Sequence, residues 1–105
     1  MNLHIESLLP DLAKAFEADY PQQFKNIPFS IVFEHGRKYI KIVGVGSNQS
    51  SCKGFICVVD TKRFKAGDLL KCASWNAPAT NFARGSIFDI PKAVADGHIK
   101  WTGIA

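Results

Sequence analysis

The sequence lacks the long apolar run of a membrane protein and the Gly- or Pro-rich periods of fibrous and repeat proteins. Its first residues, MNLHIESLLPDL, contain no basic segment and no cleavage site of small residues, so we expect no secretory signal. Apolar residues make up 47% and charged residues 21% of the 105 residues, ordinary values for a folded chain. The sequence therefore predicts a single domain, residues 1–105, that does not enter membranes.

Cysteines are few and show no paired spacing. Cys52, Cys57 and Cys72 form no C-x-x-C motif, and an odd number without a secretory signal indicates free thiols in a reducing compartment. Cys57 and Cys72 lie in apolar runs, which is typical of small core residues. We therefore expect no disulfide.

The sequence also lacks an arrangement of residues that is typical of a catalytic or metal site. Its acidic residues are spread singly, and no histidine stands at a known catalytic spacing from a cysteine or serine. His4, His35 and His98 do not have the spacing of a structural zinc site. The cysteine before Lys53 breaks the P-loop pattern, which needs glycine there. We predict no catalytic residues, no metal and no cofactor.

Positive charge is concentrated in the middle of the chain. The protein has 13 Lys and Arg against 9 Asp and Glu, a formal net charge of +4. Residues 1–24 hold four acids and one base, whereas residues 37–84 hold nine bases and two acids, a net +7. A body of this charge attracts polyanions such as nucleic acids, although many basic proteins simply have a well-solvated basic surface.

Residues 3–19 have the spacing of an amphipathic helix. Pro10 has no N–H and fits best in a first helical turn, so Ser7 is the expected N-cap, and Pro21 ends the helix. The apolar face, which we expect in the core, follows steps of four, three and four through Ile5, Leu9, Leu12 and Phe16.

A hairpin is predicted over residues 28–45. With His35 and Gly36 as a two-residue turn, apolar side chains share one face and Glu34 pairs with Arg37. A shift of one residue would mix the two faces. The apolar face, which we expect against the N-terminal helix, consists of Phe29, Ile31, Phe33, Ile40 and Ile42.

Two further strands are predicted after a polar segment. Residues 44–54 have no apolar period and are expected to form a mobile loop. Residues 55–60 and 68–73 are apolar, and the basic turn 61–67 joins them in a second hairpin. The sequence thus predicts an α+β fold: an antiparallel sheet of about four strands in two hairpins, packed against the N-terminal helix, with basic side chains on the other face and an irregular C-terminal segment.

The segment 71–89, KCASWNAPATNFARGSIFD, fits neither a helix nor a strand. Two interpretations of it remain open. In one, Trp75 and Phe82 plug the open end of the sheet and Arg84 binds loop carbonyls or Asp89. In the other, Lys71, Trp75 and Arg84 line a surface for a flat anionic ligand such as single-stranded nucleic acid.

Residues 39–89 contain a set of short motifs. They are Y-I-K-I at 39–42, G-F-I at 54–56 and, most specifically, a block at 67–89 of the form G-D-x-x-K-A-A-S-W-x-A-P-A-x-x-x-A-R-G-x-x-F-D, in which Cys72 replaces an alanine. In these motifs the chain resembles a group of small proteins of tailed bacteriophages. The resemblance implies a phage protein made in the cytoplasm of a bacterial host, and it implies no particular activity.

Residues 90–105 are predicted to form a short helical turn after Pro91, ended by Gly97, and then an edge strand. An exposed Trp101 in that strand would indicate a homodimer contact.

Two functions from different classes remain open. The first is binding of single-stranded nucleic acid through basic and aromatic side chains, without a base-reading motif. The second is a phage protein that binds and blocks a host protein, which a small basic protein suits equally well. The residues expected to bind nucleic acid are Lys41, Arg63, Lys71, Trp75 and Arg84.

Overall fold

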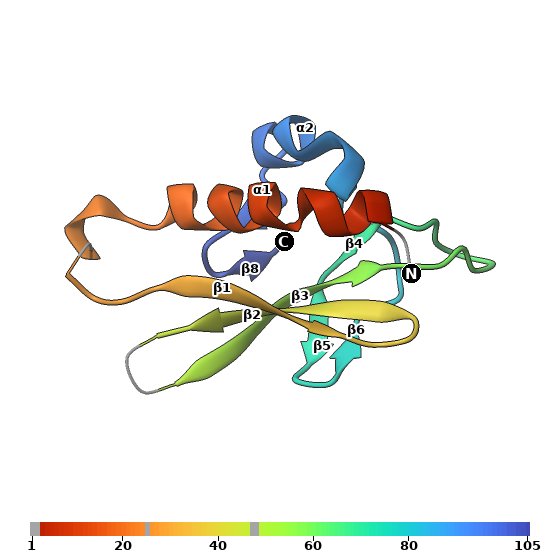
Figure 1. The fold of residues 1–105 in the computed structure, drawn as a ribbon, viewed down its shortest axis with the longest axis horizontal. Helices are drawn as coiled ribbons and strands as arrows, with labels where there is room; N and C mark the ends of the chain where they lie inside the picture. Colours follow the sequence, from red (N-terminus) through yellow and green to blue (C-terminus); the bar gives the residue numbers. More distant parts are fainter. Residues whose placement is uncertain (1–2, 25, 47–48) are drawn as a thin grey trace.

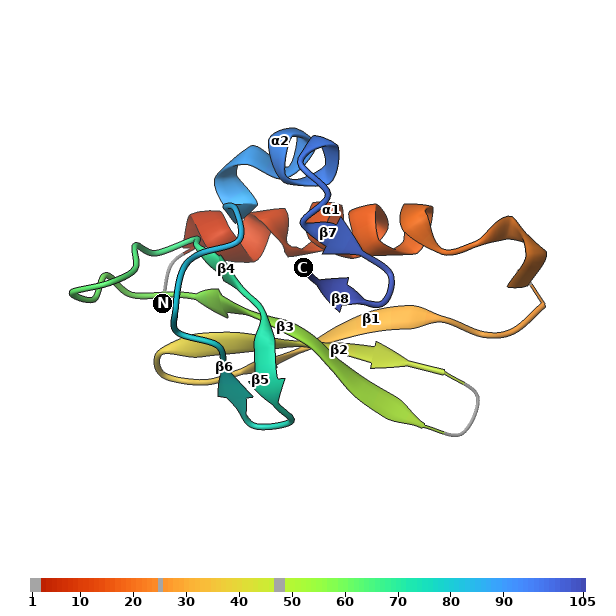
Figure 2. The ribbon, with the colours of Figure 1, turned by 180° about the vertical axis from the view of Figure 1, so that it is seen from behind.

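The computed structural model describes residues 3–24, 26–46 and 49–105. The helix α1 (Leu3–Asp19) lies across one face of a four-stranded antiparallel sheet, and a small hairpin lies against the other face (Figures 1 and 2). The predicted α+β architecture is confirmed. The sheet has the order β1-β2-β3-β4, and its strands are β1 (Ser30–His35), β2 (Tyr39–Val45), β3 (Ser50–Cys57) and β4 (Leu69–Leu70). The small hairpin consists of β5 (Cys72–Ser74) and β6 (Ala77–Pro78).

The helix α1 packs its predicted apolar face on the sheet. Pro10 lies inside the helix and not in its first turn, so the expected N-cap at Ser7 is wrong. The Ser7 hydroxyl instead donates a hydrogen bond to the carbonyl of His4 (2.7 Å). A proline inside a helix removes one backbone hydrogen bond, and the complete burial of Ile5 upstream of it offsets that loss. The side chains of the predicted face are all buried: Ile5, Leu9, Leu12 and Phe16.

The strands β1 and β2 form the predicted hairpin in a register that differs by four residues. Glu34 pairs with Lys41, so the expected pairing of Glu34 with Arg37 is wrong and the turn is centred on residues 37–38. The residue that follows β3 favours this position, because the Val58 N–H donates a hydrogen bond to the Lys38 carbonyl (2.9 Å). A shift by an even number keeps every side chain on its own face. The predicted apolar face is confirmed, with these residues buried or packed against the core: Phe29, Ile31, Phe33, Ile40 and Ile42.

Strand pairing continues through most of the segment predicted as a loop. Gly44 pairs with Ser51, and Lys53 is the extra residue of a bulge opposite the step from Ile42 to Val43. The expected loop over 44–54 is therefore wrong for these residues, because backbone pairing and not apolar alternation forms the strand ends. Residues 47–48 of that expected loop lie outside the described residues.

The strand β3 occupies the predicted interior position between β2 and β4. Phe55 pairs with Leu70, which confirms the second hairpin, but β4 ends there because the chain turns away into β5. Two apolar clusters lie on opposite faces of this sheet. The larger cluster lies under α1, and the smaller one, here named the outer cluster, is buried at Phe55, Cys57, Phe64 and Leu70 with Tyr39, Cys52, Cys72 and Ala83 around it.

The C-terminal part adds a short helix and a small hairpin. Gly97, with φ +79°, follows the helix end as predicted. Trp101 is half-buried among aromatic rings, so the exposed Trp101 that motivated a homodimer is not present. Helices in the described ranges are all too short or too polar to cross a membrane. The remaining elements are η1 (Gln22–Phe24), η2 (Ile87–Asp89), α2 (Ile90–Ala95), and β7 (Ile99–Lys100) with β8 (Gly103–Ile104), which pair with each other and not with the main sheet.

Candidate functional site

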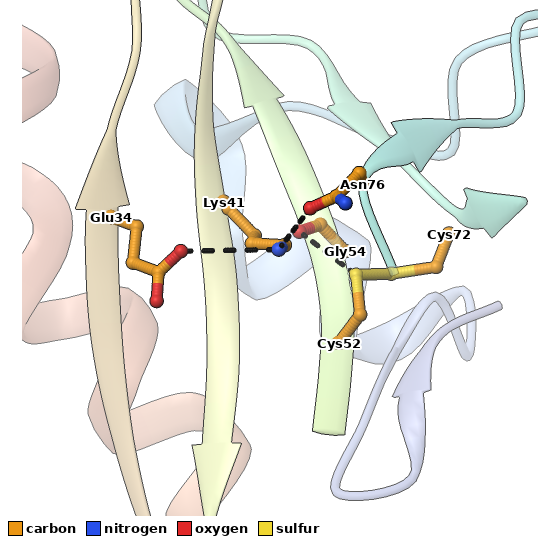
Figure 3. Close-up of a disulfide and its surroundings, with 6 residues drawn as sticks. All are labelled: Glu34, Lys41, Cys52, Gly54, Cys72 and Asn76. Carbon is orange, nitrogen blue, oxygen red and sulfur yellow. Dashed lines mark hydrogen bonds and ion pairs between the residues drawn. A yellow bond between two sulfur atoms is a disulfide. The ribbon is translucent and has the colours of Figure 1, made fainter. Parts of the chain in front are cut away.

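A disulfide attaches the β5–β6 hairpin to the outer face of the sheet. Cys52 in β3 is bonded to Cys72 in β5, and Cys57 is the free cysteine (Figure 3). The expectation of three free thiols is therefore wrong. It treated residues 44–54 as a loop, whereas the strand that forms there holds Cys52 beside β5, with 6.4 Å between the two Cα atoms.

Lys41 connects the sheet to this hairpin. It lies on the outer face between Glu34 and Phe55 of the neighbouring strands, and only 8% of the residue is exposed. Its ammonium group donates a hydrogen bond to Asn76 Oδ1 (3.1 Å) and lies 3.9 Å from Glu34 Oε1 (Figure 3). The same nitrogen is 3.8 Å from the centroid of the Trp75 ring. The Lys41 ammonium therefore contacts one face of the Trp75 ring, and it is not a free surface cation.

Asn76 is a residue that the sequence reasoning missed. It forms a two-residue turn with Trp75 between Ser74 and Ala77, which pair across the hairpin. Neither turn residue has a positive φ, so the role of Asn76 here is not a left-handed backbone but the side-chain oxygen that accepts the hydrogen bond from Lys41. The run S-W-N-A between two short strands was the signal that could have found it.

Two aromatic rings on this side of the molecule are exposed, and each lies against a cation. Trp75 is 45% exposed above Lys41, and Phe82 is 54% exposed. The guanidinium carbon of Arg84 is 3.9 Å from the centroid of the Phe82 ring. This exposure contradicts the interpretation in which Trp75 and Phe82 plug the end of the sheet. The Nε atom of Arg84 is buried and has no hydrogen-bond partner in the described part of the chain.

Arg63 and Lys71 are exposed. Like Arg84, each of them is next in sequence to a residue of the outer cluster. The chain neighbours of these three basic residues all belong to the outer cluster, since they are Phe64, Leu70 and Ala83. The structure thus joins Lys41 to Trp75 and Arg84 to Phe82, whereas Arg63 and Lys71 are exposed residues that adjoin members of the outer cluster in sequence.

The remaining cysteine, Cys57, is buried and has a thiol of low reactivity. Burial raises the pKa of the Cys57 thiol, so the thiol stays protonated at neutral pH. The thiol donates a hydrogen bond to the carbonyl of Val59 (3.0 Å). In the parts of the chain that the structure describes, no group of three or more His, Cys, Asp or Glu could hold a metal ion.

The chain belongs to a family of unknown function, DUF7717, whose model matches residues 2–105. The match covers every helix and strand described above. No curated protein and no solved structure matches the chain.

Proposed function

We propose that this protein binds single-stranded nucleic acid, without strong sequence preference, on the face that carries the β5–β6 hairpin. The observation that carries the proposal is the pairing of two exposed aromatic rings with cations, Trp75 with Lys41 and Phe82 with Arg84. A ring that is supported from one side offers its other face to a base. We name this face the outer surface and define it by Arg63, Lys71, Trp75, Phe82 and Arg84.

The expected energies suit a weak, sequence-tolerant interaction. Each base stacked on an aromatic ring contributes ~1–3 kcal/mol, and every base has a face that can stack. Phosphate groups need cations that are not already occupied, and Arg63, Lys71 and Arg84 meet this condition better than the buried Lys41. The net +7 of residues 37–84 adds long-range attraction for a polyanion.

We also infer that the protein is made by a tailed bacteriophage in the cytoplasm of its host, as the motifs of residues 39–89 indicate. Such a cytoplasm keeps thiols reduced, so Cys52 and Cys72 are expected to be reduced there. The contacts of Lys41 with Asn76 and Trp75 would then hold the hairpin on the sheet.

The exposed aromatic rings support a second candidate function, which is binding to a host protein. Tryptophan is among the residues that contribute most to protein interfaces. Phe88 and Val94, each 45% exposed, add apolar area elsewhere on the C-terminal half of the chain. A protein partner needs such apolar anchors, whereas a nucleic acid needs the free cations around them.

Fluorescence anisotropy with a short, labelled, single-stranded oligonucleotide separates the two functions. Three phosphate contacts on a single strand predict a slope of about −2 when log K is plotted against log salt. Saturable binding in low salt with that slope supports the proposal. Absence of binding at tens of micromolar protein in low salt contradicts it and favours the host-protein function, which a pull-down from host lysate would then test.

A further inference from the structure

A pocket of about 510 Å³ lies on the helix side of the sheet, away from the outer surface. It is bounded by the end of α1, by the segment that leads into β1, and by the paired arms of β2 and β3, at the end of the molecule remote from β5 and β6 (Figures 1 and 2). Its volume lies in the range of small-molecule sites. The pocket is therefore large enough for one small ligand.

Aromatic rings form the walls of this pocket. The ring of Tyr20 is stacked on that of Phe29, with centroids 4.6 Å apart and planes inclined by 10°. Trp101 meets Tyr20 edge-on at 5.2 Å and Phe24 at 6.1 Å. These rings come from three separate parts of the chain and hold one another in place. A flat apolar body would find stacking partners here.

The cation of the pocket is Lys53, whose residue is 9% exposed. Its ammonium nitrogen lies 5.8 Å from the ring centroids of both Phe29 and Trp101. Within the described ranges the Lys53 ammonium has no hydrogen bond or ion pair, and the residues that line the pocket include no carboxylate. Asp19, which precedes the lining residue Tyr20 in sequence, accepts a hydrogen bond from the backbone N–H of Trp101 (2.8 Å).

The fold makes room for this lysine. A Cβ atom on Gly44, across the strand pair, would collide with the Lys53 side chain. The bulge at Lys53 turns it toward this side of the sheet, because it adds one residue between Cys52 and Gly54. Burial lowers the pKa of Lys53. Besides these two rings the ammonium has no anionic partner within the described ranges, and an anionic ligand would compensate its partial loss of hydration.

We propose that this pocket binds a small ligand that carries one anionic group on a flat aromatic body, with the Lys53 ammonium bound to the anion and the aromatic walls around the ring. Carboxylates and phosphate monoesters share this chemistry, so a free aromatic carboxylate and a nucleoside monophosphate are both within the proposed class. The proposal does not depend on the outer surface, because the two sites lie on opposite faces of the sheet.

The two tryptophans report on the two faces separately. Trp101 lines the pocket and Trp75 lies on the outer surface, so their indole N–H signals in a ¹H–¹⁵N correlation spectrum form a matched pair. The probes are indole-3-acetate as a flat anion, indole-3-acetamide as its neutral counterpart, acetate as an anion without a ring, and adenosine monophosphate as the phosphate source. Each is titrated into the intact protein.

The proposal predicts that indole-3-acetate, adenosine monophosphate or both shift the Trp101 signal saturably and leave that of Trp75 unchanged. Indole-3-acetamide and acetate should bind about tenfold more weakly or worse, since each lacks one half of the recognition. The variant Lys53→Met, which keeps the apolar stem, should lose this preference for the anion and bind acid and amide alike. A well-dispersed ¹H–¹⁵N spectrum of this variant is the control for its folding.

Three results would overturn the proposal. They are no saturable shift of Trp101 with either anionic aromatic probe, equal binding of indole-3-acetate and its amide by the native protein, and unchanged anion preference in Lys53→Met. The comparison of acid with amide uses the native chain and decides the question even where the variant fails to fold. Failure of oligonucleotide binding would leave these results unaffected, so the two proposals are tested independently.

Discussion

The ammonium nitrogen of Lys41 lies 3.8 Å from the centroid of the Trp75 ring, although the two residues are on different β-structures. A buried lysine is normally costly, but here Asn76, Glu34 and the ring share its charge. The ring in turn is held in one orientation while almost half of the residue remains exposed. The outer surface thus has an aromatic platform that is fixed before any ligand arrives.

Lys41→Met tests this support directly. Methionine keeps an apolar stem on the sheet but removes the hydrogen bond to Asn76 and the cation under Trp75, so we expect a loss of about 1–2 kcal/mol in the free energy of unfolding. Oligonucleotide affinity should fall because the ring is less well oriented, while the salt slope stays the same. Urea unfolding and anisotropy over a salt series measure both. A slope that flattens by ~0.7 would show that Lys41 contacts a phosphate itself.

Arg84→Ala should remove one phosphate contact from the outer surface. The expected result is a salt slope smaller in magnitude by ~0.7 and weaker binding at low salt. Lys14→Ala is the matched control, because Lys14 is an exposed base on α1, on the opposite side of the sheet. Equal slopes for the Arg84 variant and the native protein would exclude this guanidinium from the interface.

Trp75→Ala should weaken oligonucleotide binding by ~1–3 kcal/mol without a change in salt slope, since the indole contributes stacking and no charge. Because the ring is 45% exposed, its loss should affect stability less than a core truncation of ~3–5 kcal/mol. Phe88→Ala is a suitable control, as Phe88 is equally exposed but lies outside the outer surface. Similar affinity losses in both variants would argue against a specific platform at Trp75.

In oxidising buffer the disulfide should contribute measurably to the free energy of unfolding. It closes a loop with a sequence separation of 20, for which the loss of chain entropy in the unfolded state corresponds to about 3 kcal/mol. A reductant should therefore lower the urea midpoint of the native protein, and should leave a Cys52→Ala, Cys72→Ala double variant unchanged. Cys57→Ala keeps the reductant effect if Cys57 is the free thiol. A native protein that is insensitive to reductant would contradict the Cys52–Cys72 bond.

Side-chain periodicity made the layers of this fold predictable. The predicted apolar faces of residues 3–19 and of the first hairpin are correct although the helix start and the hairpin register were predicted wrongly. A register shift of four residues moved no side chain to the other face of the sheet. The turn itself could not be predicted, because the Lys38 carbonyl within it accepts a hydrogen bond from the N–H of Val58, which follows β3. A hydrogen bond between residues this far apart in sequence cannot be deduced from the local sequence.

The candidate sites were predictable only in part, for a related reason. Trp75 and Arg84 stand in a segment whose composition is unusual by itself, so the sequence singled them out. Lys53 stands in a polar run that is typical of a solvated loop. Its burial arises from a glycine on the paired strand and from Phe29 and Trp101, which are distant in sequence. Tertiary contacts, and not local pattern, create that environment.

Lys53→Met should raise stability at neutral pH, and the gain should shrink as the pH rises. Burial lowers the pKa of Lys53 below its ordinary value of 10.5, so the folded chain holds this proton less tightly than the unfolded chain. Below the folded-state pKa both states are charged, and the folded state bears the full cost of burying the cation.

Between that pKa and 10.5 the unfolded chain binds more protons, so the stability of the native protein rises with pH through this window and the cost is absent above it. The difference in urea midpoint between Lys53→Met and the native protein, measured from pH 7 into the alkaline range, isolates this group because the other titrating residues are common to both. A gain in Lys53→Met that stays constant up to pH 10.5 would instead reflect apolar packing alone, and it would remove the uncompensated charge on which the pocket's preference for anions depends.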